Sequence, residues 1–179
     1  MNKKVAIALA ITLILSIGIL FAGNPAPASF NVTTIVEGIN KLKVTTTDVT
    51  DNPAQFDAAD VFTSLSITSA GEQTFDAYLS TLSNNRQGYK VTMTATAMFS
   101  VGGFGELSSY INYTVSANGA SVTTNGSTAV PAINVIDESM IFDLTSLSYK
   151  ISLSVDQASF DSAVQGSYTG TVTFNYTAN

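Results

Sequence analysis

A two-residue alternation of apolar and polar side chains is the feature that most constrains this fold. It is clearest over residues 88–100, 147–155 and 168–177, where apolar residues alternate with Thr, Ser, Lys or Asn. Successive side chains of a strand point to opposite faces, so this period is typical of half-buried strands. No long helical pattern competes with it. The alternation therefore predicts an all-β chain.

Shorter alternating stretches predict the remaining strands. They cover residues 41–47, 61–68, 110–116, 120–124 and 140–144. Asn118-Gly119 separates two of them, and Asn-Gly accepts the positive φ angles of a tight hairpin turn. Strands that recur at short spacing without intervening helices favour a single antiparallel β-sandwich of about seven to nine strands.

Two segments fit this pattern less simply. Residues 70–82 combine a capping-box spacing with apolar residues at helical spacing, yet their end alternates like a strand, so both interpretations stay open. The segment 155–166 reads as a loop with one helical turn, with Phe160 and Val164 expected to face the core.

The first 28 residues have the layout of an export signal, which we expect to form a helix. Lys3 and Lys4 precede an apolar run over residues 5–21, and Ala26 and Ala28 supply the small-x-small pattern of a cleavage site. We expect cleavage after Ala28, which leaves residues 29–179 as the single folded domain and places it in the periplasm, on the cell surface or outside the cell. The alternative is a periplasmic protein held at the membrane by an uncleaved run over residues 5–21.

Composition excludes several classes of function. The chain has no Cys, His or Trp, which removes disulfides, thiolate or imidazole metal sites and a Ser-His-Asp triad. Without Lys3 and Lys4, five cations remain against 13 acids, a net charge of -8. A scattered set of cations on an acidic chain argues against binding to nucleic acid or anionic membrane.

No set of residues completes a catalytic site, so we expect no enzymatic activity and no cofactor. A weak calcium candidate is the acidic group Asp48, Asp51, Asp57 and Asp60, because calcium takes several oxygen ligands. Their spacing departs from known calcium loops, and a solvated acidic loop is the favoured interpretation. Metal ligation at these residues stays an alternative.

Three segments resemble bacterial pilin-like and spore-coat-U-like secreted domains. They are Ser83-Asn84-Asn85-Arg86-Gln87-Gly88-Tyr89-Lys90-Val91, then Tyr113-Thr114-Val115 with Asn118-Gly119 and Val122, and the terminal Gly166-Ser167-Tyr168-Thr169-Gly170-Thr171-Val172-Thr173-Phe174. The resemblance implies an immunoglobulin-like sandwich that acts as a subunit of a fimbria-like surface assembly. The chain departs from that pattern because it lacks the disulfide common in pilins, and Glu37-Gly38 stands where a Phe-Gly pair is expected.

The segment directly after the expected cleavage site is the candidate partner-binding element. Phe30, Val32, Thr34 and Val36 occupy alternate positions of an extended stretch. In the resembled families such an extension completes the sheet of the next subunit by strand addition. The alternative is the first strand of this chain's own sheet, so pairing in cis or in trans stays open.

The expected function is that of an exported structural subunit working through self-association or contacts with other surface subunits, with a periplasmic chaperone as a further partner. An alternative is an adhesin or carbohydrate-binding module, in which Tyr78, Tyr110 or Tyr113 would stack on sugar rings.

Overall fold

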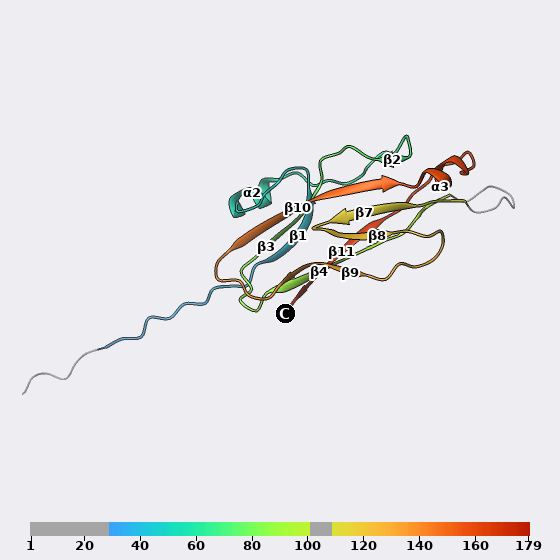
Figure 1. Cartoon of the computed structure of the whole chain (residues 1–179). Helices are drawn as coiled ribbons and strands as arrows, with labels where there is room; N and C mark the ends of the chain where they lie inside the picture. Colours follow the sequence, from blue (N-terminus) through green and yellow to red (C-terminus); the bar gives the residue numbers. More distant parts are fainter. Residues whose placement is uncertain (1–28, 101–108) are drawn as a thin grey trace, which may run out of the picture. The chain divides into compact units, whose positions relative to one another are not determined.

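The computed structural model describes residues 29–100 and 109–179, shown in colour in Figure 1. The expected signal helix, the cleavage residues Ala26 and Ala28 and the apolar run over residues 5–21 lie outside the described residues. The chain divides into two units, residues 1–36 and 37–179, which are treated separately. Every strand and helix of the described residues belongs to the second unit.

The second unit is an antiparallel β-sandwich, which confirms the predicted all-β class. Its strands are β1 (Asn40–Thr45), β2 (Gly71–Glu72), β3 (Tyr78–Ser83), β4 (Tyr89–Ala95), β5 (Met98–Ser100), β6 (Ser109–Ile111), β7 (Tyr113–Ala117), β8 (Ala120–Thr123), β9 (Ile133–Glu138), β10 (Thr145–Val155) and β11 (Val172–Ala178). One sheet has the order β1-β3-β10-β7-β8 with β2 on β10, a second has the order β11-β4-β9, and β5 pairs with β6. The described strands outnumber the seven to nine expected, because the count includes short pieces such as β2.

The core lies between the two larger sheets and follows the predicted alternation. In β4, Tyr89, Val91, Met93 and Ala95 are buried, while the residues between them are half-buried. They join buried side chains of β7, β8 and β10 in one apolar cluster. Burial of this apolar surface is the main stabilising contribution to the fold.

A second, smaller cluster covers the outer face of β3. The short helix α2 (Pro53–Ala58) places Phe56 against Val49 and Leu82, and all three are buried. Asn52 begins this helix, and its side chain accepts a hydrogen bond from the Gln55 N–H. Because α2 covers one face and the core the other, β3 is buried on both faces after its first residue.

The structure resolves the two ambiguous segments. Residues 78–83 are strand β3, so the strand interpretation is right for the end of the 70–82 stretch. The expected helical turn is α3 (Gln157–Asp161), which Asp156 begins by accepting a hydrogen bond from the Ser159 N–H (2.8 Å). Phe160 packs on the core as predicted, but Val164 is 54% exposed, which corrects that expectation.

Two predicted strands are wrong and one real strand escaped prediction. Residues 62–68 form no strand, and Val61 makes only an isolated bridge with Thr45. The segment 140–144 is a loop with Met140 and Phe142 exposed. The strand in that region is β9, whose pairing with β4 shifts register between Val91 and Thr92. Within the described residues, no helix has the length and apolar character needed to cross a membrane.

Candidate functional site

The segment that precedes the sandwich presents apolar side chains to solvent. Residues 29–39 form neither helix nor strand. Phe30 is 85% exposed, and Val32, Ile35 and Val36 are at least 80% exposed. Thr34, the fourth candidate partner-binding residue, is also exposed. Four large apolar side chains are therefore exposed within seven residues, and clusters of exposed apolar side chains mark interaction sites.

Asn84 fixes the point at which this segment leaves the sandwich. Its side-chain Oδ1 accepts a hydrogen bond from Ile39 N (2.6 Å), and its Nδ2 donates to Glu37 O (3.0 Å). The main-chain N–H of Asn84 donates to Ile39 O (3.1 Å). Ile39 also packs against the cluster around Phe56. Residues 37–39 are therefore held from their first residue, while residues 29–36 are not part of the folded unit.

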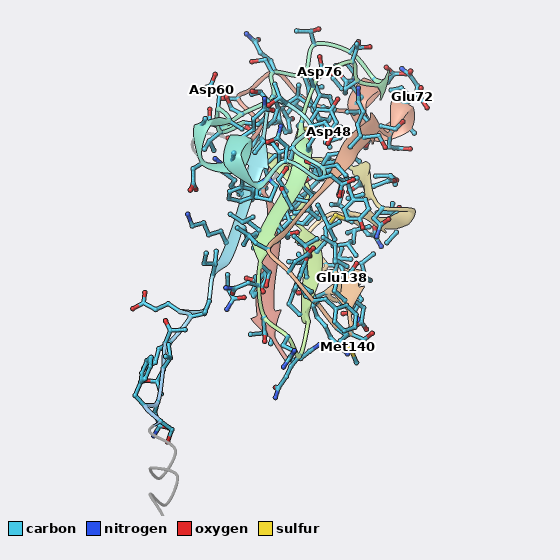
Figure 2. All side chains as sticks on the ribbon, turned by 90° about the vertical axis from the view of Figure 1, so that its left-hand side faces the viewer. Asp48, Asp60, Glu72, Asp76, Glu138 and Met140 are labelled. Atoms are coloured by element: carbon cyan, nitrogen blue, oxygen red, sulfur yellow. The ribbon has the colours of Figure 1, made fainter. Side chains whose placement is uncertain are left out.

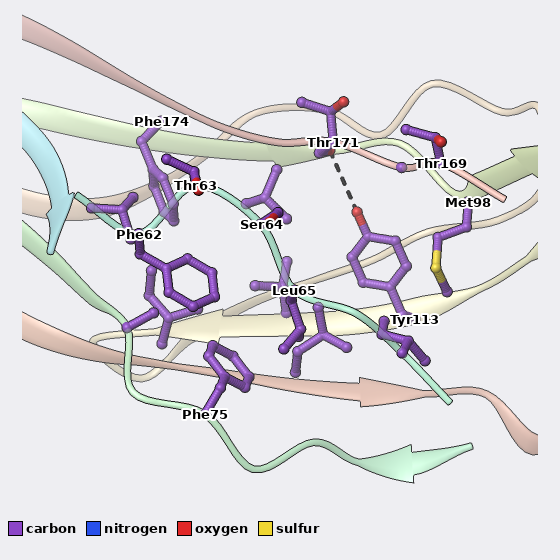
Figure 3. A pocket seen from close by; sticks show the side chains of 18 of the residues that line it. Phe62, Thr63, Ser64, Leu65, Phe75, Met98, Tyr113, Thr169, Thr171 and Phe174 are labelled. Carbon is purple, nitrogen blue, oxygen red and sulfur yellow. Dashed lines mark hydrogen bonds between the residues drawn. The ribbon is translucent and has the colours of Figure 1, made fainter. Parts of the chain in front are cut away.

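An apolar cavity opens between the two larger sheets of the sandwich. Its volume is ≈ 490 Å³, and Figure 3 shows Phe62, Leu65, Phe75, Tyr113 and Phe174 along its wall. The Tyr113 hydroxyl donates to Thr171 O (3.4 Å), the dashed line of Figure 3. Burial raises the pKa of Tyr113 to about 12. The wall is thus mainly aromatic and aliphatic, and it suits apolar side chains rather than charged ligands.

One wall of the cavity is an edge strand. Among the described strands, β11 pairs with β4 alone, and Val172 and Phe174 line the cavity. Thr96 N donates to Thr171 O (2.9 Å), and Asn179 N donates to Gly88 O (3.1 Å), so the odd-numbered residues of β11 bond to β4. In an antiparallel ladder the alternate residues then point their N–H groups outward. The N–H groups of Val172, Phe174 and Tyr176 therefore face the open edge.

An irregular segment, residues 62–68, also lines the cavity. Phe62 N donates to Val44 O (2.9 Å), which ties the start of the segment to β1. Beyond that point, no main-chain hydrogen bond within the described residues joins residues 63–68 to either sheet. Leu65 and Ile67 reach the cavity, whereas the alternate residues are exposed. Side-chain burial alone positions this wall, so its local opening costs little.

The four candidate calcium ligands are not brought together. Asp48, Asp51, Asp57 and Asp60 are all exposed, and Figure 2 labels Asp48 and Asp60 apart. The Asp48 carboxylate accepts from Thr50 N (2.8 Å). In Asp57, the hydrogen bond from Lys41 (2.8 Å) lowers the pKa of the carboxyl. Among the described residues, no three acidic side chains converge on a point where a metal ion could bind.

The three candidate sugar-stacking tyrosines lie in different places. Tyr113 is buried in the cavity wall. Tyr78 is half-buried, and the Lys150 ammonium lies 5.8 Å from its ring centroid. Tyr110 is half-buried on β6 with its ring 5.0 Å from that of Phe99. No ring pair among the described residues joins two of these tyrosines.

Sequence reasoning proposed a partner-binding role for residues 30–36, whose apolar side chains are exposed in the structure, but it did not predict the cavity or the role of Asn84. The cavity combines residues from distant parts of the chain, including the irregular segment 62–67 that alternation assigned to a strand. In the sequence, Asn84 is only one residue of a segment that resembles secreted domains, whereas its contact with Glu37 spans 47 positions. No local pattern reports a contact of that range.

Comparisons with protein-family models, with curated proteins and with solved structures find no match.

Proposed function

We propose that this chain is an exported structural subunit of a surface or pilus-like assembly that associates by strand addition. In this proposal, Phe30–Val36 of one copy pairs with the open edge of β11 in another copy. The observation that carries it is an exposed apolar segment in a chain whose sandwich combines an edge strand with an apolar cavity. Among residues 29–100 and 109–179, no strand pairs with the outer edge of β11 and no strand includes Phe30–Val36.

Two kinds of contact would hold the added strand. The outward N–H groups of Val172, Phe174 and Tyr176 supply main-chain donors, which give affinity regardless of side chain. Phe30, Val32 and Val36 occupy alternate positions, so one face of the added strand carries all three toward the cavity. Burial of each of these side chains contributes roughly 1.5–3 kcal/mol.

The irregular wall of the cavity suits such an addition. Residues 63–68 have no main-chain hydrogen bonds to either sheet within the described part of the chain, so they can move aside without breaking a strand pair. An open edge beside an apolar cavity also invites wrong pairing before assembly. A periplasmic chaperone that covers this edge until a subunit arrives is therefore part of the proposal.

Peptide binding tests the strand addition. The protein is residues 37–179, which contain both core clusters and every described strand and therefore carry their own core. The probe is a synthetic peptide of residues 29–38. We expect saturable binding by calorimetry, and line broadening or shifts of the β11 amides in NMR spectra.

Two altered peptides separate the contacts. A peptide with Val32→Asp places a charge toward the cavity and should bind at least tenfold more weakly, because an unpaired charge is costly to bury. A peptide N-methylated at alternate positions keeps its side chains but loses main-chain donors, and it should also bind weakly. Equal binding of all three peptides, or no binding of the native peptide, would refute strand addition.

A further inference from the structure

The loop between β9 and β10 is a second apolar feature of the sandwich. Phe142 is 82% exposed and Met140 is 58% exposed, whereas Ile141 between them is buried. The buried Ile141 anchors the loop, and Asp143 accepts a hydrogen bond from Thr145 Oγ1 (3.0 Å) at its end. Two large apolar side chains are thus held outward on a fixed loop, an arrangement that marks a contact surface.

This loop lies at the end of the sandwich from which the N-terminal segment departs. Asn40 and Thr145 both pair with Ser83, so the start of β1 and the start of β10 flank the same residue of β3. Tyr89 pairs with Glu138, which brings the Asn84 turn beside the end of β9. Figure 2 views the molecule from this side and labels Glu138 and Met140. Neighbouring strands are about 4.8 Å apart, so the loop begins within roughly 10 Å of the Asn84 contact.

No free linker residue separates the added strand from the sandwich of the same copy. Val36 is the last residue of the proposed added strand, and Glu37 is already held by Asn84 (3.0 Å). Seven extended residues reach at most about 25 Å. When Phe30–Val36 of one copy lies on the β11 edge of a neighbour, the end of the sandwich that carries Asn84 in the first copy must therefore lie against that neighbour.

We infer that Met140 and Phe142 of each copy pack against the neighbouring copy that receives its N-terminal segment. This inference rests on the proposed function and adds a second contact surface to it. The occupant is another copy of this chain, because the tether leaves no room for a different molecule between the two. Met140 and Phe142 then exchange an exposed position for a buried one on assembly, alongside the added strand.

The test compares Phe142→Ser with Phe142→Leu in residues 29–179. Phe142 is 82% exposed, so neither variant should change the thermal unfolding of residues 37–179, which lack the N-terminal segment. Self-association measured by sedimentation should be on the order of 10- to 100-fold weaker for Phe142→Ser, because a buried aromatic side chain is lost from the interface. Phe142→Leu keeps an apolar side chain and should associate nearly as the parent chain does.

The peptide of residues 29–38 separates the two claims. Added to residues 37–179 that carry Phe142→Ser, it should bind as it does to the parent sequence, because the peptide has no sandwich attached. Normal peptide binding with unchanged self-association of Phe142→Ser would overturn the loop contact and leave strand addition standing. Failure of the native peptide to bind the parent sequence would overturn both.

Discussion

Two buried tyrosines make the stability of the sandwich depend on pH. The Tyr89 hydroxyl shares a 2.7 Å hydrogen bond with Thr81 Oγ1, and burial raises the pKa of Tyr89 to about 12. Burial raises the pKa of Tyr113 to about 12 as well. Both hydroxyls are neutral in the folded chain at pH values where they would ionise in the unfolded chain. Stability is therefore linked to the protonation of two core residues.

This linkage predicts alkaline destabilisation. A folded-state pKa above the unfolded value of 10.0 means that the contribution is complete below pH 10 and is lost as the pH rises toward 12. Each tyrosine then accounts for roughly 2–3 kcal/mol of unfolding free energy. Urea titrations from about pH 9 to about pH 12, which bracket the unfolded and folded pKa values, should show the fall. Tyr113→Phe should remove about half of it. The same fall in both proteins would contradict the assignment.

Individual residues also show which contacts the sequence predicts and which it does not. The alternation correctly predicts that Tyr89, Val91 and Met93 share the buried face of one strand. It does not predict that Asn84 holds Glu37, because that contact depends on β1 pairing with β3 across the intervening chain. Local patterns report which side of an element is buried, whereas contacts between elements follow from topology.

At the scale of elements, helix α2 forms a small second core with the outer face of β3. Phe56 is 2% exposed and packs with Val49 and Leu82, apart from the main cluster. Phe56→Ala should lower the unfolding free energy by about 3 kcal/mol, because it removes a buried ring. Gln55→Ala in the same helix changes an exposed side chain and should stay within about 0.5 kcal/mol of the parent. Chemical denaturation of the two variants measures this, and equal stabilities would mean that α2 contributes little to the fold.

The wrongly predicted strands have a common physical reason. Residues 61–68 alternate because Leu65 and Ile67 face a cavity, yet beyond the Val61 bridge and the Phe62 hydrogen bond to β1 no described strand pairs with the segment. In β9, by contrast, Val135 and Ile136 are adjacent and both buried, because the pairing with β4 shifts there. An alternating sequence indicates that one side of an extended segment is buried. A strand also needs main-chain hydrogen bonds to a neighbouring strand, and alternation does not report those. A bulge breaks the pattern while the pairing continues.

At the scale of the whole molecule, the exposed N-terminal segment should determine the oligomeric state. Residues 29–179 should form concentration-dependent oligomers by sedimentation or light scattering. Val32→Asp in the same chain should remain monomeric, because the charged side chain opposes burial beside the cavity. Asn31→Asp adds the same charge on the opposite face of the segment and is the matched control. A monomeric parent chain at high concentration would mean that the segment does not pair between copies.

The contact between Asn84 and residues 37–39 has a mechanical consequence for the proposed assembly. Tension along a fibre would pass from one copy into the next through Glu37 and directly into β1. Because β1 is paired with β3 from Asn40 through Thr45, a pull along its axis acts on the whole row of hydrogen bonds together instead of opening them one by one. In the proposed assembly, β1 would therefore carry the load across all of its pairs with β3 at once, and the domain would resist stretching.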